Sequence, residues 1–175
     1  MPISQVCYTS RLRAEALVAN GHTAVISITD PGTPDARLAV GFKDILRLSF
    51  FDAVPADEYL PAPMLGMFDH LMARRIGSFV SEQHAAPGDI VVIVHCEYGV
   101  SRSAAVALFV EAYASAPLVA REFAYDANQW VVDQLLRQYP DLYIEIPSLA
   151  EVEERRAEFR AAAIPAGNGE NLMGG

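Results

Sequence analysis

Residues 90–110 read IVVIVHCEYGVSRSAAVALFV, and they give the clearest indication of how this chain folds. The stretch from Ile90 to Val94 is an almost pure β-branched run, which is typical of a strand buried on both faces. The stretch from Ser103 to Ala114 is apolar and rich in alanine, and it predicts a buried helix. The central unit is therefore a strand, a short loop and a helix, as in α/β proteins.

The segments on the N-terminal side of this unit predict further strands and helices. Runs of β-branched and apolar residues predict strands, and apolar residues at helical spacing predict helices. The expected strands are Ile3 to Tyr8, His22 to Thr29 and Asp44 to Phe51, and the expected helices are Arg11 to Asn20 and Pro63 to His84. The residues from Phe51 to Pro63 contain three prolines and should form a loop.

The C-terminal part predicts helices alone. Pro117 is expected to open one helix, and Asp126 followed by Gln129 resembles the cap of another that runs to Tyr139. A capping box that begins at Ser148 predicts a last helix towards Ala163. Strands alternating with helices, followed by helices, predict an α/β fold. We expect a three-layer sandwich with a small central, mostly parallel sheet flanked by helices.

Composition restricts the class of protein before any site is considered. A chain of 175 residues fits one domain, which we expect over residues 1–165, with a flexible tail over residues 166–175. The net charge of -9, from 22 acidic and 13 basic residues, argues against binding to nucleic acid or to an anionic membrane. Two cysteines cannot make a disulfide-rich scaffold, and neither a secretory signal nor a membrane span is visible, so we expect a cytoplasmic protein.

The loop between the buried strand and the buried helix has the features of an anion site with a nucleophile. Backbone N–H groups of such a loop can turn inwards, and the following helix points its positive end at the same place. Gly99 permits a backbone geometry that a side chain would obstruct. Arg102, at the helix start, can hold two phosphate oxygens at once. Cys96 ends the strand, and these surroundings favour its thiolate over its thiol.

The nine residues from His95 to Ser103 resemble the signature loop of the cysteine-dependent protein tyrosine phosphatases, which reads His-Cys, five residues, Arg, then Ser or Thr. The ending GVSRS is most similar to the dual-specificity branch and its bacterial relatives. The resemblance implies that Cys96 attacks phosphorus and forms a phosphocysteine, while Arg102 binds the phosphate and stabilises the transition state. It implies that His95 buttresses the loop and that Ser103 hydrogen-bonds the thiolate.

The same resemblance implies that the variable residues of the loop bind the substrate mostly through their backbone amides. These residues are Glu97, Tyr98, Gly99, Val100 and Ser101. It also implies a phosphotyrosine-phosphatase-like fold. The loop is thus expected to hold phosphate or another oxyanion.

A phosphatase of this type also needs a general acid to protonate the leaving oxygen, and the family uses an aspartate upstream of the cysteine. Asp52 follows a predicted strand directly, as the family's acid does, and we favour it over Asp57. The separation of 44 positions between Asp52 and Cys96 is longer than in compact dual-specificity members. The long predicted helix between them can absorb the difference.

The remaining candidates point to structure rather than to chemistry. His22, His70 and His84 lack metal-ligand spacing, so we expect neither a metal nor another cofactor. Cys7, on a predicted strand, is most simply a core residue. A redox partnership between Cys7 and Cys96 is the alternative.

The variable loop positions also bear on the substrate. Glu97 and Tyr98 stand where phosphoinositide phosphatases of this superfamily place basic residues, so we expect a phosphotyrosine-containing protein or a small aryl phosphomonoester. Tyrosine-only and dual specificity both stay open. Two other functions also stay open: a phosphate-binding module that has lost turnover, and a sulfurtransferase.

Overall fold

The fold is that of a computed structural model, which describes residues 2–55 and 64–162. Its centre is a sheet of four strands in the order β1-β4-β2-β3. The strands are β1 (Ile3–Ser10), β2 (Thr23–Thr29), β3 (Asp44–Ser49) and β4 (Ile90–Cys96). Every neighbouring pair is parallel, so all four strands end at the same edge of the sheet.

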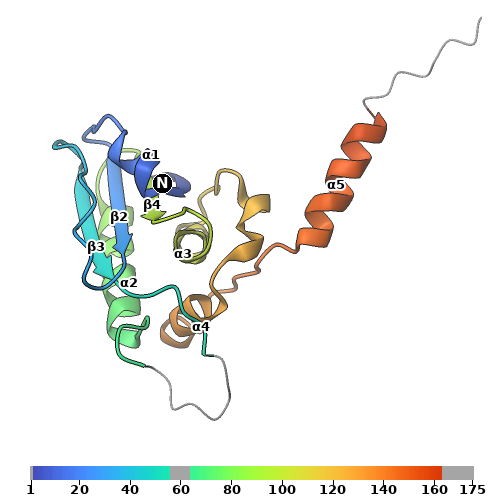
Figure 1. The fold of residues 1–175 in the computed structure, drawn as a ribbon. Helices are drawn as coiled ribbons and strands as arrows, with labels where there is room; N and C mark the ends of the chain where they lie inside the picture. Colours follow the sequence, from blue (N-terminus) through green and yellow to red (C-terminus); the bar gives the residue numbers. More distant parts are fainter. Residues whose placement is uncertain (1, 56–63, 163–175) are drawn as a thin grey trace, which may run out of the picture.

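Helices cover both faces of this sheet and complete a three-layer α/β sandwich (Figure 1). The elements are α1 (Arg11–Glu15), α2 (His70–Ala85), α3 (Arg102–Ala114), the 3-10 helix η1 (Arg121–Asp126), α4 (Gln129–Gln138) and α5 (Leu149–Ala162). α3 packs on β1 and β4, and α2 and α4 lie beside it. The short α1 packs on β1 and β4. The predicted sandwich is confirmed, and its sheet is wholly parallel.

The buried strand of the sequence analysis is confirmed as β4, with one difference in burial. Val92, Val94 and Cys96 are buried against the layer of α3, whereas Val91 and Ile93 on the other face are only partly buried. That face is covered by α1, which has five residues and is too short to cover the whole strand.

Two predicted helices are shorter than their sequence patterns suggested. The helix expected from Arg11 to Asn20 ends at Glu15, where the N–H groups of Ala16 and Leu17 bond to carbonyls three residues back and tighten the last turn. The side chain of Asn20 then accepts hydrogen bonds from His22 and Thr23 where the chain enters β2. The helix expected from Pro63 begins only at His70, where the carboxylate of Asp69 caps the N–H of Met72 at 2.9 Å. Pro63 itself lies outside the described residues.

Two further expectations for the C-terminal half were wrong. Pro117 opens no helix; the segment around Leu118 is extended and pairs with the outer side of β1, whose backbone groups would otherwise lack partners. The cap of α4 is Asn128 rather than Asp126, and its side chain accepts from the N–H of Val131 at 3.1 Å. α4 ends at Gln138, one residue before Tyr139.

The last described helix, α5, begins at the capping box that the sequence predicts. Ser148 and Glu151 form the expected capping box, with the N–H of each bonded to the side chain of the other. α5 then runs to Ala162, packs mainly against η1 and extends away from the sheet (Figure 1). The predicted tail over residues 166–175 lies outside the described residues. Within the described ranges, no helix combines the length and the apolar character that crossing a membrane requires.

Candidate active site

The candidate site lies at the carboxyl end of β4, between the ends of β1 and β2. The loop from Glu97 to Ser101 leads from β4 into α3. Its first residue is anchored where β1 meets α1, because the N–H of Arg11 donates to the carbonyl of Glu97 at 3.2 Å. Gly99 has a φ of +71°, and a Cβ there would overlap the backbone of Thr9 and Ser10. Glycine is therefore required both by conformation and by space.

The sulfur of Cys96 is buried and surrounded by polar groups. It accepts a hydrogen bond from the N–H of Gly99 at 3.3 Å and lies 3.1 Å from Oγ of Ser103. The N-terminus of α3 is at the same loop. A loop amide, a hydroxyl and the N-terminal end of a helix are therefore gathered around the sulfur.

Arg102 is the first residue of α3 and is only 2% exposed. Its Nη1 donates to Oδ1 of Asp30 at 2.6 Å and to the carbonyl of Phe50 at 2.7 Å. Its Nε is buried and has no hydrogen-bond partner among the described residues. A buried N–H donor without a partner is costly, and an anion bound in the loop would satisfy it.

His95 is fully buried directly before Cys96. Its Nε2 lies 2.8 Å from Oγ of Ser27 on the neighbouring strand β2. Burial lowers the pKa of His95 from 6.5 to about 4, and the charge of Arg11 acts in the same direction. The imidazole is therefore neutral near pH 7 and links the base of the loop to the sheet.

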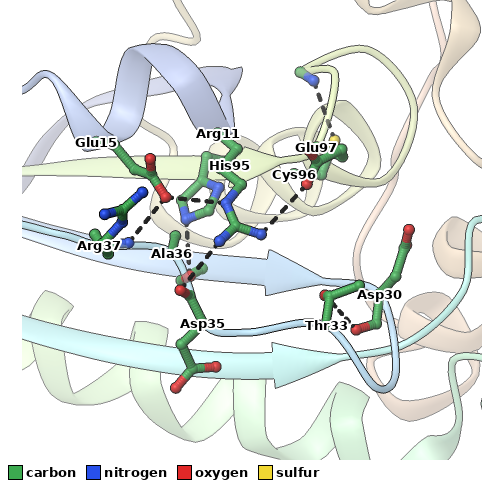
Figure 2. A network of polar contacts seen from close by, with 12 residues as sticks. Arg11, Glu15, Asp30, Thr33, Asp35, Ala36, Arg37, His95, Cys96 and Glu97 are labelled. Atoms are coloured by element: carbon green, nitrogen blue, oxygen red, sulfur yellow. Dashed lines mark hydrogen bonds and ion pairs between the residues drawn. The ribbon is translucent and has the colours of Figure 1, made fainter.

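A network around Arg11 holds the other flank of the loop (Figure 2). The Arg11 guanidinium contacts Glu15 at 3.0 Å and Glu97 at 3.6 Å, and it donates to the carbonyl of Asp35. Glu15 also accepts from the N–H of Arg37. The carboxylate of Glu97 is therefore held by a cation of α1.

Asp52 lies three residues beyond β3, and the structure brings its exposed side chain to the loop. Its Oδ1 accepts hydrogen bonds from Oγ of Ser101 at 2.8 Å and from Nδ2 of Asn128 at 2.7 Å. The favoured acid candidate is thus held beside the residue that precedes Arg102. Asp57, the second candidate, lies outside the described residues.

The other two variable loop residues, Tyr98 and Val100, point their side chains outwards. Both are exposed, and with Gly99 they line a surface hollow of about 610 Å³ between the end of β1 and η1. Their side chains therefore leave the inside of the loop to backbone groups. Among the described residues, no group of three or more His, Cys, Asp or Glu side chains is placed to hold a metal ion.

Cys7 is on a strand, as predicted, but it is half-buried rather than in the core. Burial raises the pKa of its thiol. In the parallel register Ser10 is opposite Cys96, whereas Cys7 is opposite Ile93. Three residues correspond to about 10 Å along a strand, so a disulfide between the two cysteines is out of reach.

Four residues of the site were missed by the sequence analysis: Asp30, Asn128, Arg11 and Ser27. Asp30 directly follows β2, and the strand-then-aspartate pattern that led to Asp52 applies to it as well. Nothing local in the sequence points to the others, because their partners are far away in the chain.

The residues of the signature-like loop are together, and Asp52 lies beside them. No family model matches this chain, and no curated protein is similar enough to it to count as a match. The functional interpretation therefore depends on the geometry of the site and on the resemblance of its loop.

Proposed function

We propose that the protein is a phosphomonoester hydrolase of the cysteine-dependent protein tyrosine phosphatase type, related to the dual-specificity branch. The observation that carries the proposal is the buried guanidinium of Arg102, whose Nε has no partner among the described residues, on the loop that holds the sulfur of Cys96. Such a guanidinium binds two oxygens of a phosphate at once. The likeness of the loop to the family signature supports the same function.

In this proposal the loop binds the phosphate and the sulfur attacks it. The backbone amides, the N-terminus of α3 and Arg102 stabilise the charge on the phosphoryl oxygens. A bond forms between the sulfur of Cys96 and phosphorus, while the bond from phosphorus to the leaving oxygen breaks. A thiolate can only accept, so in this form the hydroxyl of Ser103, 3.1 Å from the sulfur, donates to it and supports its negative charge.

Asp52 is the proposed general acid and base. It gives a proton to the leaving oxygen, and it then takes a proton from the water that attacks the phosphocysteine. That second step releases inorganic phosphate and restores the thiolate. The hydrogen bonds from Ser101 and Asn128 hold the Asp52 carboxylate at the rim of the loop, where both transfers occur.

The charges around the loop favour a singly phosphorylated substrate. Positions 97–101 contain no Lys or Arg, and the carboxylates of Asp30 and Asp52 lie at the site. A polyphosphorylated lipid headgroup would need several further cations there. We therefore propose a phosphotyrosine-containing protein or a small aryl phosphomonoester as substrate. A reducing compartment such as the cytoplasm would keep the thiol reduced.

The test is hydrolysis of p-nitrophenyl phosphate by the wild type, by Cys96→Ser and by Cys7→Ser as the matched cysteine control. We expect turnover in the wild type and in Cys7→Ser, and none in Cys96→Ser. A phosphocysteine detected by mass spectrometry after acid quenching would identify the nucleophile. A well-folded wild type that binds phosphate without turnover would overturn the hydrolase and leave a phosphate-binding module.

A further inference from the structure

A buried arginine needs a partner for its charge, and the structure shows which residue supplies it. Arg102 is almost fully buried, and an unpaired buried charge is strongly unfavourable. Among the described residues, the carboxylate that bonds to Arg102 is that of Asp30, at 2.6 Å. Asp30 follows β2, whereas Arg102 follows β4, and these two strands are neighbours in the sheet.

The contact with Asp30 is made by one nitrogen of the guanidinium, and this determines which of its N–H groups stay available for a ligand. Asp30 and the carbonyl of Phe50 both accept from Nη1 of Arg102. Nε has no partner among the described residues, and Nη2 donates no hydrogen bond to any of them. Nε and Nη2 form one edge of the planar guanidinium, and that edge fits two oxygens of a phosphate. The acceptors on Nη1 therefore leave the phosphate-binding edge unoccupied.

Asp30 is itself held in place by the turn that it begins. Its carbonyl accepts from the N–H of Thr33 at 3.1 Å and from the Thr33 hydroxyl at 2.7 Å. Figure 2 shows that the Asp30 carboxylate extends away from this turn, at the end of the strands where Cys96 also lies. The side chain is 41% exposed, so solvent screens its attraction to Arg102, while the turn and the hydrogen bond to Nη1 define its position.

We propose that Asp30 is a positioning residue for phosphate binding: it fixes the rotation of Arg102 so that Nε and Nη2 face the loop. This proposal rests on the proposed function, since the phosphate is the ligand of that site. Asp30 neither transfers a proton nor contacts the reacting atoms. Its contribution is the orientation of the guanidinium and partial compensation of its charge.

The test compares substitutions that separate position from charge. Asp30→Asn keeps an oxygen at the position of Oδ1 and loses the charge. Asp30→Ala loses both, and Asp30→Glu keeps the charge but moves it outwards by one methylene. Asp35→Ala is the matched control, because the Asp35 carboxylate pairs with Arg47 rather than with Arg102. Its contact with Arg11 is made by the backbone carbonyl, which alanine retains.

The readouts are the affinity for inorganic phosphate, by titration calorimetry, and the kinetics with p-nitrophenyl phosphate across pH. We expect Asp30→Ala to weaken phosphate binding and to lower kcat/KM by about 100-fold, as a misplacement of about 1 Å in a catalytic group does. Asp30→Asn should stay within about tenfold of the wild type, and Asp35→Ala should match it. The alkaline limb of the pH–rate profile reports the group that donates the proton, so it should remain in all three Asp30 variants.

Three results would overturn the proposal. Wild-type phosphate affinity in Asp30→Ala would show that Arg102 needs no such partner. Equal losses in Asp30→Asn and Asp30→Ala, with disappearance of the alkaline limb, would make Asp30 a proton donor. Full activity in Asp30→Glu with none in Asp30→Asn would make charge the deciding property, and this comparison stands even if Asp30→Ala does not fold. Phosphate affinity is measured without turnover. A wild type that binds phosphate but does not hydrolyse p-nitrophenyl phosphate would therefore overturn the proposed hydrolase and still leave the role of Asp30 to be tested by binding.

Discussion

Lowering the pH should destabilise the folded protein through His95, whose ring is buried and neutral. The pKa of His95 is about 4 in the folded state against 6.5 for an unperturbed histidine. Between these values the unfolded state binds the proton and the folded state does not, so the free energy of unfolding falls as the pH falls from about 6.5 to about 4. A difference of this size corresponds to about 3 kcal/mol once the pH is below both values.

The assay is urea denaturation followed by far-UV circular dichroism at several pH values between 7 and 4. His95→Gln replaces the titrating ring with a neutral amide that can still reach Ser27, so its curve lacks the contribution of His95. We expect the wild type to lose about 3 kcal/mol more than this variant between pH 7 and 4. His22→Gln is the control, because His22 is exposed.

Parallel pH curves for the wild type and His95→Gln would refute this reasoning. They would show that the ring gains its proton in the folded protein as easily as in the unfolded chain. The imidazole would then reach water or another hydrogen-bond acceptor through its Nδ1, which has no partner among the described residues.

Three further predictions concern the loop, the proposed general acid and the packing of α2 against the end of α4. Gly99→Ala should lower the Tm and abolish phosphate binding, because a Cβ there overlaps the backbone of β1. Gly88 has a similar φ but open space around it, so Gly88→Ala should lower the free energy of unfolding by only about 1–2 kcal/mol, the cost of the left-handed conformation, and equal effects of the two variants would exclude the overlap. Asp52→Ala should lower kcat by about 10²–10⁴ and remove the alkaline limb of the pH profile, and unchanged kinetics would exclude it as the acid. Gly77→Ala should destabilise the fold by about 1–3 kcal/mol in urea denaturation, because a Cβ there overlaps the hydroxyl of Tyr139; an unchanged midpoint would mean that Tyr139 moves aside freely.

The parts of the fold that could be predicted from sequence are those with strong local signals. The β-branched runs give β2 and β4, and the pair Ser148 and Glu151 gives the start of α5. Helical spacing of apolar residues was less reliable, because it reports burial rather than backbone conformation. Phe68 belongs to that apolar spacing and is buried, yet it precedes α2, which begins only at His70.

The residues of the candidate site also fall into those that have a local sequence signal and those that do not. The loop from His95 to Ser103 is continuous in sequence, so its residues could be identified together. Asp30 and Asn128 reach the loop only through the sheet order and the packing of α4, and they are 72 and 76 positions away from their partners Arg102 and Asp52. A local pattern such as an aspartate after a strand can mark Asp30 as a candidate, but it does not identify a partner so far along the chain, so these contacts needed the three-dimensional structure.

The place of β1 in the sheet has a consequence for how the chain is made. β1 is synthesised before both of its partners, which are β4 on one side and the segment around Leu118 on the other. Its backbone therefore stays unpaired until about 80 further residues have been synthesised, when β4 can cover one side, and its other side waits for the segment around Leu118. Gly99 can pack against Thr9 and Ser10 only after β4 has paired with β1. The thiol of Cys96 thus acquires its surroundings only after β4 has paired with a strand that was synthesised well before it.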